Sequence, residues 1–148
     1  MASPPYLSVE VAAPFNIDEQ RAFYCLNEEH VLQDFHFDDV KGSWKQGRLA
    51  RLGAKAALDA EIAATIVVDG SIYVFYQTPS RAILSLHSGP NGEWRAVTDL
   101  PSTQPSNRVS IYAMTIDNTI HLFYTHQDNL IHELVFDGKW IGERSKII

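Results

Sequence analysis

The sequence predicts an all-β protein built from three copies of one four-stranded unit. A Phe-Tyr pair recurs with spacings of 52 and 48 residues, beginning at Phe23, Phe75 and Phe123. A tryptophan follows each pair, at Trp44, Trp94 and Trp140. Turn-forming pairs such as Asp69-Gly70 and Asp137-Gly138 separate the apolar segments. A four-stranded unit that repeats every 40–50 residues or so is typical of a β-propeller blade.

Each unit is expected to contain four short strands in the same order. The first is a small apolar segment, at 9–13, 62–65 and 111–114. The second strand carries the Phe-Tyr pair, the third carries Val31, Ile83 or Ile131, and the fourth begins at or near the tryptophan. The chain is thus interpreted as a single domain, 1–148, with blades at about 8–58, 60–106 and 108–148.

One segment does not fit a pure strand pattern. Residues 48–60 are rich in Ala, Leu, Arg and Lys, which favour helix. Read alone, this segment could form a short helix. Within the repeat it contains the end of the first unit and the link to the second, and we give the repeat more weight.

Three blades do not close a ring, because propellers typically have about 4–8. Two apolar blade faces would remain uncovered, and a monomer rarely exposes patches of that size. A two-fold homodimer gives six blades, whereas a trimer would give nine, outside the usual range. We therefore expect this chain to be half of a six-bladed propeller.

Charge and composition argue against several classes of partner. The net charge is -6 with 12 Lys and Arg against 18 Asp and Glu, which disfavours nucleic acid and anionic membrane surfaces. No apolar run is long enough to cross a bilayer, and the N-terminal segment lacks the features of a secretory signal. A cytoplasmic location is expected, with unconventional secretion left open. Cys25 has no partner for an internal disulfide and is expected to be a buried thiol.

Several segments carry a resemblance to a known family. They are Ser43 to Gly47, Lys55 to Leu58, Glu61 to Thr65, Ser71 to Tyr76 and Asp128 to Glu133. This pattern resembles the fungal fucose-specific lectins across nearly the whole chain. The resemblance implies a six-bladed propeller that holds fucose between neighbouring blades. It implies an Arg on strand two and a Glu on strand three of one blade, and a Trp from the next.

The resemblance places different residues at these positions in the three blades. The arginine position holds Arg21, Tyr73 and His121, and the glutamate position holds Gln33, Ser85 and Glu133. The implied sites are Arg21, Gln33 and Trp94 between blades 1 and 2; Tyr73, Ser85 and Trp140 between blades 2 and 3; and His121, Glu133 and a partner's Trp44 at the dimer seam. Each set lacks one or both of the Arg and Glu residues, so the family's fucose site is expected to be degenerate here.

Other interpretations of these residues stay open. The tryptophans and the Phe-Tyr pairs could simply pack blade against blade. His121 and Glu133 could face each other across a hairpin, either for acid–base work or to fix the dimer. Asp34, His36 and Asp38 alternate along one strand, a spacing that could suit a metal, although an exposed polar strand face is the commoner case. We expect no metal and no cofactor.

Two ligand-binding functions follow as hypotheses, beside a third hypothesis of a purely structural or protein-binding half-propeller whose pockets are filled by side chains. The first is a lectin-like module that binds a sugar or another small ligand between blades. The alternative is a cofactor-independent fungal biosynthetic enzyme, a cyclase or a Diels–Alderase-like pericyclase, that reuses the aromatic pocket. Its candidate catalytic residues are Arg21, Tyr73, His121 and Glu133.

Overall fold

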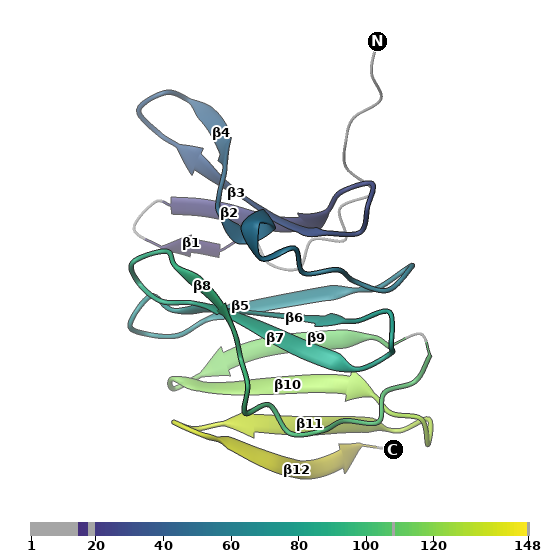
Figure 1. Ribbon diagram of the computed structural model, residues 1–148. Coiled ribbons are helices and arrows are strands. Elements are labelled where there is room, and N and C mark those ends of the chain that lie inside the picture. The colour runs from purple at the N-terminus through teal and green to yellow at the C-terminus, as the bar shows by residue number, and fades with distance from the viewer. Residues whose placement is uncertain (1–14, 18–19, 108, 148) are drawn as a thin grey trace.

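The computed structural model describes the backbone of residues 15–17, 20–107 and 109–147, and the side chains of 22–107 and 109–141. Within these residues the chain forms three four-stranded antiparallel sheets, each in simple sequence order. The sheets are stacked one upon the next, with the first at the top of Figure 1 and the third at the bottom. The predicted all-β fold of three propeller blades is confirmed.

The twelve strands have the following bounds. Blade 1 contains β1 (Phe15–Ile17), β2 (Gln20–Leu26), β3 (Leu32–Asp38) and β4 (Ser43–Gln46). Blade 2 contains β5 (Ile62–Ile66), β6 (Ile72–Gln77), β7 (Ile83–Ser88) and β8 (Trp94–Ala96). Blade 3 contains β9 (Ile111–Ile116), β10 (Thr119–Thr125), β11 (Ile131–Phe136) and β12 (Trp140–Ile147). The strand expected at 9–13 lies outside the described residues.

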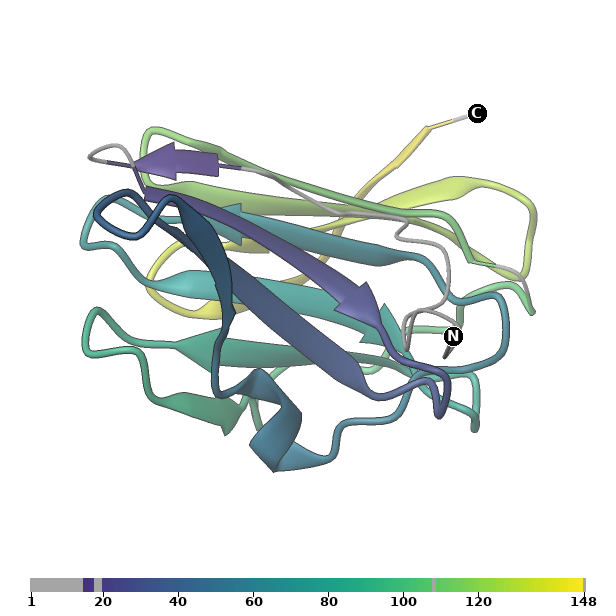
Figure 2. The ribbon, with the colours of Figure 1, turned by 90° about the horizontal axis from the view of Figure 1, so that it is seen from above.

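The helix-forming segment between blades 1 and 2 contains a short helix. It is a single 3-10 turn, η1 (Leu49–Leu52), and the rest of 48–60 is irregular apart from an isolated bridge between Val31 and Lys55. Gly53 ends the turn with a φ of 62°, a left-handed conformation that favours glycine. Figure 2 shows this turn at the edge of the stack, outside the three sheets.

The central hairpins of the three blades share one register. Phe75 lies opposite Ser85 on β6 and β7, and Phe123 lies opposite Glu133 on β10 and β11. All three hairpins close with a loop of five residues, so equivalent positions can be found by counting back from the loop. In blade 1 the corresponding pair is then Tyr24 opposite Asp34. Tyr24, Phe75 and Phe123 are therefore structurally equivalent. The sequence alignment of the Phe-Tyr pairs, which matched Phe23 with Phe75, is wrong by one residue in blade 1.

Alternation along the strands divides each blade into two faces. Between blades 1 and 2, buried Tyr24 and Leu32 pack with Val74 and Tyr76. A second core between blades 2 and 3 contains nine buried residues: Ala63, Phe75, Ile83, Val109, Ile111, Ile120, Leu122, Tyr124 and Leu134. Each blade thus presents one face to the preceding neighbour and one to the next.

The two end faces of the stack carry large apolar side chains. On blade 1, Phe23 stacks on Phe35 at 5.0 Å, and Trp44 lies edge-on to Phe23 with 46 % of its surface exposed. On blade 3, Tyr112 is 62 % exposed and Ile131 is 40 % exposed. These are the blade faces that the repeat predicted to be uncovered.

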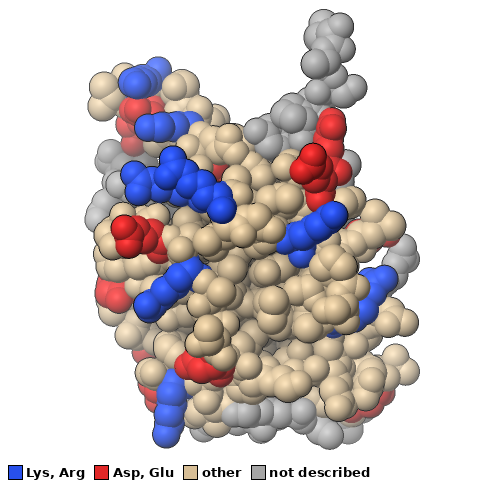
Figure 3. All heavy atoms as spheres, in the orientation of Figure 1, with Lys and Arg blue, Asp and Glu red and all other residues tan. Residues whose placement is uncertain are grey.

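Charge does not single out a site on the viewed face. In Figure 3 basic and acidic side chains are interspersed, and most of the surface between them is uncharged. Among the described residues, no helix is long and apolar enough to span a bilayer. Cys25 is buried, as expected, at 1 % exposure. The functional site must therefore be located from the geometry between blades.

Candidate functional site

The three hairpins place equivalent residues at three inter-blade positions. The strand-two and strand-three residues that face the next blade are Ala22 and Asp34 in blade 1, Tyr73 and Ser85 in blade 2, and His121 and Glu133 in blade 3. The following blade contributes the tryptophan at each position. The side chains differ so much that each position has to be considered separately.

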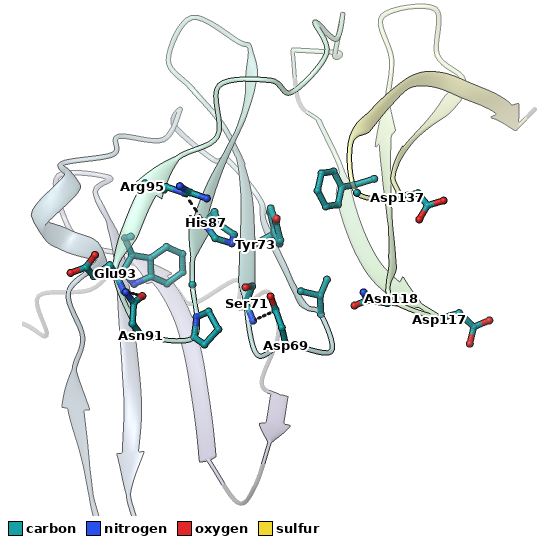
Figure 4. Close-up of a pocket in the computed structure, with 16 residues that line it drawn as sticks. Asp69, Ser71, Tyr73, His87, Asn91, Glu93, Arg95, Asp117, Asn118 and Asp137 are labelled. Atoms are coloured by element: carbon teal, nitrogen blue, oxygen red, sulfur yellow. Dashed lines mark hydrogen bonds between the residues drawn. The ribbon is translucent and has the colours of Figure 1, made fainter.

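A cleft of about 1000 Å³ lies between blades 2 and 3. Figure 4 shows Tyr73, His87 and Arg95 on the blade 2 side, with Asn118 and Asp137 across the gap. The charged side chains that line the cleft are Asp69, Glu93, Asp117, Asp137 and Arg95. The excess of carboxylates makes this cleft acidic.

Tyr73 occupies the strand-two position in this cleft. Its ring lies 4.7 Å from the His87 ring and 5.6 Å from the Phe136 ring, so its neighbours already cover much of it. Burial raises the pKa of Tyr73, and burial followed by the charge of Arg95 lowers the pKa of His87. The His87 Nδ1 atom accepts a hydrogen bond from Arg95 Nε at 3.4 Å, which requires that this nitrogen carry no proton.

Ser85 and Trp140, predicted to join Tyr73, do not line this cleft. Ser85 is 1 % exposed, and the Trp140 ring packs edge-on against Phe75 at 5.7 Å. The Ser85 hydroxyl and the Trp140 indole nitrogen are buried without a hydrogen-bond partner. Both side chains belong to the core, and only Tyr73 of the predicted set is at the cleft surface.

Between blades 1 and 2, Asp34 takes the strand-three position. Its Oδ1 atom accepts the Leu49 amide hydrogen at 2.9 Å, and its Oδ2 atom lies 2.7 Å from His36 Nε2. The side chain is 1 % exposed. A hollow of about 390 Å³ reaches Asp34 and Trp94, but the Asp34 carboxylate is already bound to the protein itself.

The residues predicted at this first position are not brought together. Gln33 lies on the opposite face of β3 from Asp34, where its side chain pairs with Gln46. The prediction that Gln33 faces Trp94 is wrong, because the hairpin register is one residue away from the sequence alignment. The side chain of Arg21 lies outside the described residues. Asp34, His36 and Asp38, which the sequence suggested as possible metal ligands, do not converge on one point. The Asp38 carboxylate instead accepts amide hydrogens from Val40 and Lys41.

The third position lies on the open face of blade 3. His121 Nδ1 is 2.9 Å from Glu133 Oε2, which confirms that the two side chains meet across the hairpin. The side chains are 24 % and 14 % exposed respectively. The tryptophan that the repeat assigns to this position is Trp44, which is exposed on the open face of blade 1 at the other end of the stack. On blade 3 this position has a histidine and a carboxylate, whereas the exposed indole lies on blade 1.

Sequence reasoning missed a second cluster on blade 3. His126, Asp128 and His132 bring two imidazoles and a carboxylate together at the β10–β11 hairpin. The spacing His-x-Asp-x-x-x-His across a predicted turn was the available signal. The cluster lies apart from the three inter-blade positions.

Comparisons with known proteins give one consistent result. The family model described as fungal fucose-specific lectin matches residues 4–147. The fucose-specific lectin of Aleuria aurantia is 28 % identical over 121 residues, which cover 78 % of this chain and 38 % of that protein. The crystal structure of that lectin, described as a six-bladed β-propeller, gives a TM-score of 0.73 at 25 % identity, covering 88 % of this chain and 44 % of that one.

A shorter protein shares the fold. The structure of a fucose lectin from Kordia zhangzhouensis in complex with methyl-fucoside gives a TM-score of 0.67 at 17 % identity, covering 93 % of this chain and 99 % of that chain. The chain therefore spans less than half the length of the Aleuria lectin, but nearly the whole of the Kordia lectin.

Proposed function

The chain belongs to the family of fungal fucose-specific lectins, and from this premise we propose that it binds carbohydrate at the seam between two copies. In this arrangement the open face of blade 3 meets the open face of blade 1 of a second copy. Two copies then close a six-bladed ring with two identical seams. The observation that carries the proposal is the His121–Glu133 pair, which remains partly exposed on a face that lacks its neighbour.

The two other inter-blade positions support this choice by exclusion. At the first, the Asp34 carboxylate is held by Leu49 and His36. At the second, Ser85 is buried in the core and Tyr73 is packed between two rings. Glu133 is the remaining carboxylate among the three equivalent strand-three residues.

The end faces have the chemistry of a buried interface. Exposed apolar residues on blade 3 include Tyr112, Ile116, Ile131 and Ile141, and a small groove of about 130 Å³ runs beside Tyr112 and Phe123. The opposite end presents the aromatic group of Phe23, Phe35, Phe37 and Trp44. Covering these surfaces contributes about 25 cal/mol for each Å² of apolar area removed from water.

The seam has the groups that a sugar needs. Hydrogen bonds from sugar hydroxyls to an ionised carboxylate are charge-assisted and stronger than neutral ones. The Trp44 indole offers an exposed flat surface for the apolar face of a pyranose ring. Glu133 lies on β11 and Trp44 on β4, and these strands belong to the two end blades of the stack (Figure 1), so neither copy alone completes the site.

The test combines mass and binding measurements on the same preparation. Light scattering gives the mass in solution, and methyl fucoside and a panel of other monosaccharides are titrated by calorimetry. Glu133→Gln removes the carboxylate charge at the seam, and Arg95→Gln is the matched change in the cleft between blades 2 and 3. We expect a dimer whose sugar affinity falls at least tenfold in Glu133→Gln and stays unchanged in Arg95→Gln.

Three outcomes would contradict the proposal. A monomer that binds sugar would show that the seam is not needed. A dimer whose affinity is lost in Arg95→Gln but kept in Glu133→Gln would move the site to the cleft. Absence of binding to every sugar on a glycan array would remove the lectin function itself.

A further inference from the structure

We infer that His126, Asp128 and His132 form a binding site for a divalent transition-metal ion of the zinc class. This site is separate from the proposed sugar site and does not depend on it. One imidazole nitrogen from each histidine and a carboxylate oxygen of Asp128 lie within 4.8 Å of one another. Imidazole and carboxylate are ligands that suit zinc, copper, nickel and iron.

The local fold holds the three side chains together. His126 and Asp128 belong to the loop that joins β10 to β11, and His132 is the second residue of β11. The loop is closed by hydrogen bonds from the His126 amide to the Leu130 carbonyl and from the Asn129 amide to the His126 carbonyl, both 2.9 Å. A positive φ of 67° at Asn129 completes the turn, which is a conformation that asparagine tolerates.

Both imidazoles are aimed at the same carboxylate. His126 Nδ1 is 3.0 Å from Asp128 Oδ1, and His132 Nε2 is 2.9 Å from Asp128 Oδ2. The two rings are parallel, with centroids 3.8 Å apart and an interplanar angle of 4°. A metal ion lies in the plane of each imidazole that binds it, so the two rings must rotate out of this parallel arrangement before both nitrogens can bind one ion.

The contacts of His126 Nδ1 favour a cation at this place. The Asp128 amide donates a hydrogen bond to this nitrogen at 3.1 Å, so the nitrogen acts as an acceptor. The same nitrogen lies 3.0 Å from the carboxylate oxygen, which is also an acceptor. One neutral tautomer satisfies only one of these contacts. A metal ion beside the carboxylate instead receives electron pairs from both imidazoles and from the carboxylate.

Burial further supports a ligand role for the histidines. His132 is 1 % exposed and His126 is 13 % exposed, whereas Asp128 is 34 % exposed. The Tyr124 ring lies 6.4 Å from the His126 imidazole and 5.8 Å from the His132 imidazole. An ion would thus be held from the protein side by two oriented imidazoles, with solvent access at the Asp128 side for a further ligand.

The nitrogen–oxygen separations already suit a metal ion. Zinc binds nitrogen at about 2.0–2.1 Å and carboxylate oxygen at about 2.0–2.2 Å, which puts neighbouring donors roughly 3.4 Å apart in a tetrahedral site. The existing nitrogen–oxygen separations of 3.0 and 2.9 Å are already close to that value.

The position suggests a structural role for the ion. The loop contacts the segment that connects blades 2 and 3, where Pro105 forms a bridge with His126 and the Gln127 amide donates to the Gln104 carbonyl at 2.9 Å. An ion bound by this loop would stiffen the junction between the two blades. Metal binding to the folded state alone also raises thermal stability by mass action.

The test uses the untagged full chain, stripped with a chelator and titrated with Zn²⁺ by calorimetry, with Ca²⁺ and Mg²⁺ as comparison ions. Co²⁺ serves as a spectroscopic probe, because tetrahedral and octahedral cobalt differ strongly in visible absorption. Zinc is expected to bind at one ion per chain, to raise the Tm and to be preferred over Ca²⁺ and Mg²⁺. Binding should weaken at least tenfold in His126→Gln and in Asp128→Asn.

His36→Gln is the matched control, because His36 also lies beside an aspartate but has no second imidazole at hand. Its zinc affinity should equal that of the unchanged chain. Circular dichroism verifies folding, and His126→Gln is used in preference to changes at the more deeply buried His132. The inference is overturned if zinc does not bind saturably, or if zinc binds equally well to the folded His126→Gln and Asp128→Asn variants. Either result would mean that the cluster is only a hydrogen-bonded structure.

Discussion

Ser85 shows how a polar strand residue can become part of the core between two blades. Its hydroxyl is buried between blades 2 and 3 and has no hydrogen-bond partner. Leaving a buried polar group unpaired costs about 1–3 kcal/mol, because the group gives up water without replacement. The Ser85 side chain is thus tolerated at this position, but its hydroxyl does not stabilise the folded protein.

Replacing this hydroxyl is expected to increase stability. Ser85→Ala should raise the free energy of unfolding by about 1 kcal/mol, since it removes an unpaired polar group and only one heavy atom. Urea unfolding followed by tryptophan fluorescence measures the change. The control is Thr65→Val, which removes a buried hydroxyl that is paired with Thr115 at 2.7 Å and should lower stability instead. A loss of stability in Ser85→Ala would show that the hydroxyl has a partner after all.

Cys25 leads to a prediction about alkaline pH. Burial, followed by the negative charge of Asp34, raises the pKa of this thiol from 9.0 to about 11. Between these values the unfolded chain loses the thiol proton while the folded chain keeps it, so stability falls as the pH rises. From pH 9 to 10 the free energy of unfolding should fall more steeply in the unchanged chain than in Cys25→Ala. Denaturant unfolding at each pH measures both slopes, and equal slopes would contradict the raised pKa.

The sequence could identify most of the residues that face a neighbouring blade, but not those of blade 1. Phe23-Tyr24 looks like Phe75-Tyr76, so aligning the aromatic pairs puts Gln33 where the structure has Asp34. The difference arises from the register of the β2–β3 hairpin. Composition cannot reveal it, because both alignments give alternating apolar residues. The repeat did identify the His121–Glu133 pair, since the register of blade 3 agrees with the sequence alignment.

At the scale of the element, the junction after β4 depends on a close backbone approach. Gly47 follows β4, and its amide donates to the Asp34 carbonyl at 2.8 Å. A Cβ atom on this glycine would lie 2.1 Å from the Asp34 carboxylate. The carboxylate cannot move away without losing the hydrogen bond from the Leu49 amide, which begins η1.

This geometry makes Gly47 sensitive to substitution. Gly47→Ala should lower the free energy of unfolding by roughly 1–3 kcal/mol, the usual cost of overpacking a fixed site. Gly89→Ala is the control, because its Cβ would approach the exposed Asn91 Oδ1 atom no closer than 3.2 Å and His87 Cε1 no closer than 4.0 Å, and it should have a smaller effect. Thermal unfolding of the two variants in parallel measures the difference. Equal stability would mean that the β4–η1 junction readily rearranges.

The linking segment shows where local propensity is overridden. Residues 48–60 favour helix by composition, yet the helix ends after one turn at Gly53. The chain then returns to the stack, and the buried residues Ala56, Ala57 and Ala60 pack in the core between blades 1 and 2. Small side chains that promote a helix in isolation here allow the chain to pass close to the sheets. Tertiary packing therefore determines the conformation of this segment.

At the scale of the whole molecule, the three-sheet stack ends in two different apolar faces. In the proposed ring of six blades, the face of blade 3 would meet the face of blade 1 of another copy. A two-fold axis would make both seams identical, so each substitution in the chain would act twice in the dimer. This symmetry would make the assembly sensitive to a single charge on either face.

Ile131→Glu tests the proposed assembly and the proposed site together. Ile131 is 40 % exposed on the open face of blade 3. Closing the ring would bury the new carboxylate, and burying an unpaired charge is strongly unfavourable. The variant should be a folded monomer by light scattering and should lose sugar affinity, even though Glu133 and Trp44 are unchanged.

The control is Val68→Glu, which places the same charge at a turn where the side chain is 85 % exposed and should leave the dimer intact. A monomeric Ile131→Glu variant that retains full sugar affinity would separate binding from assembly. The ligand would then have to be bound within one chain, and the cleft between blades 2 and 3 would be the place to examine.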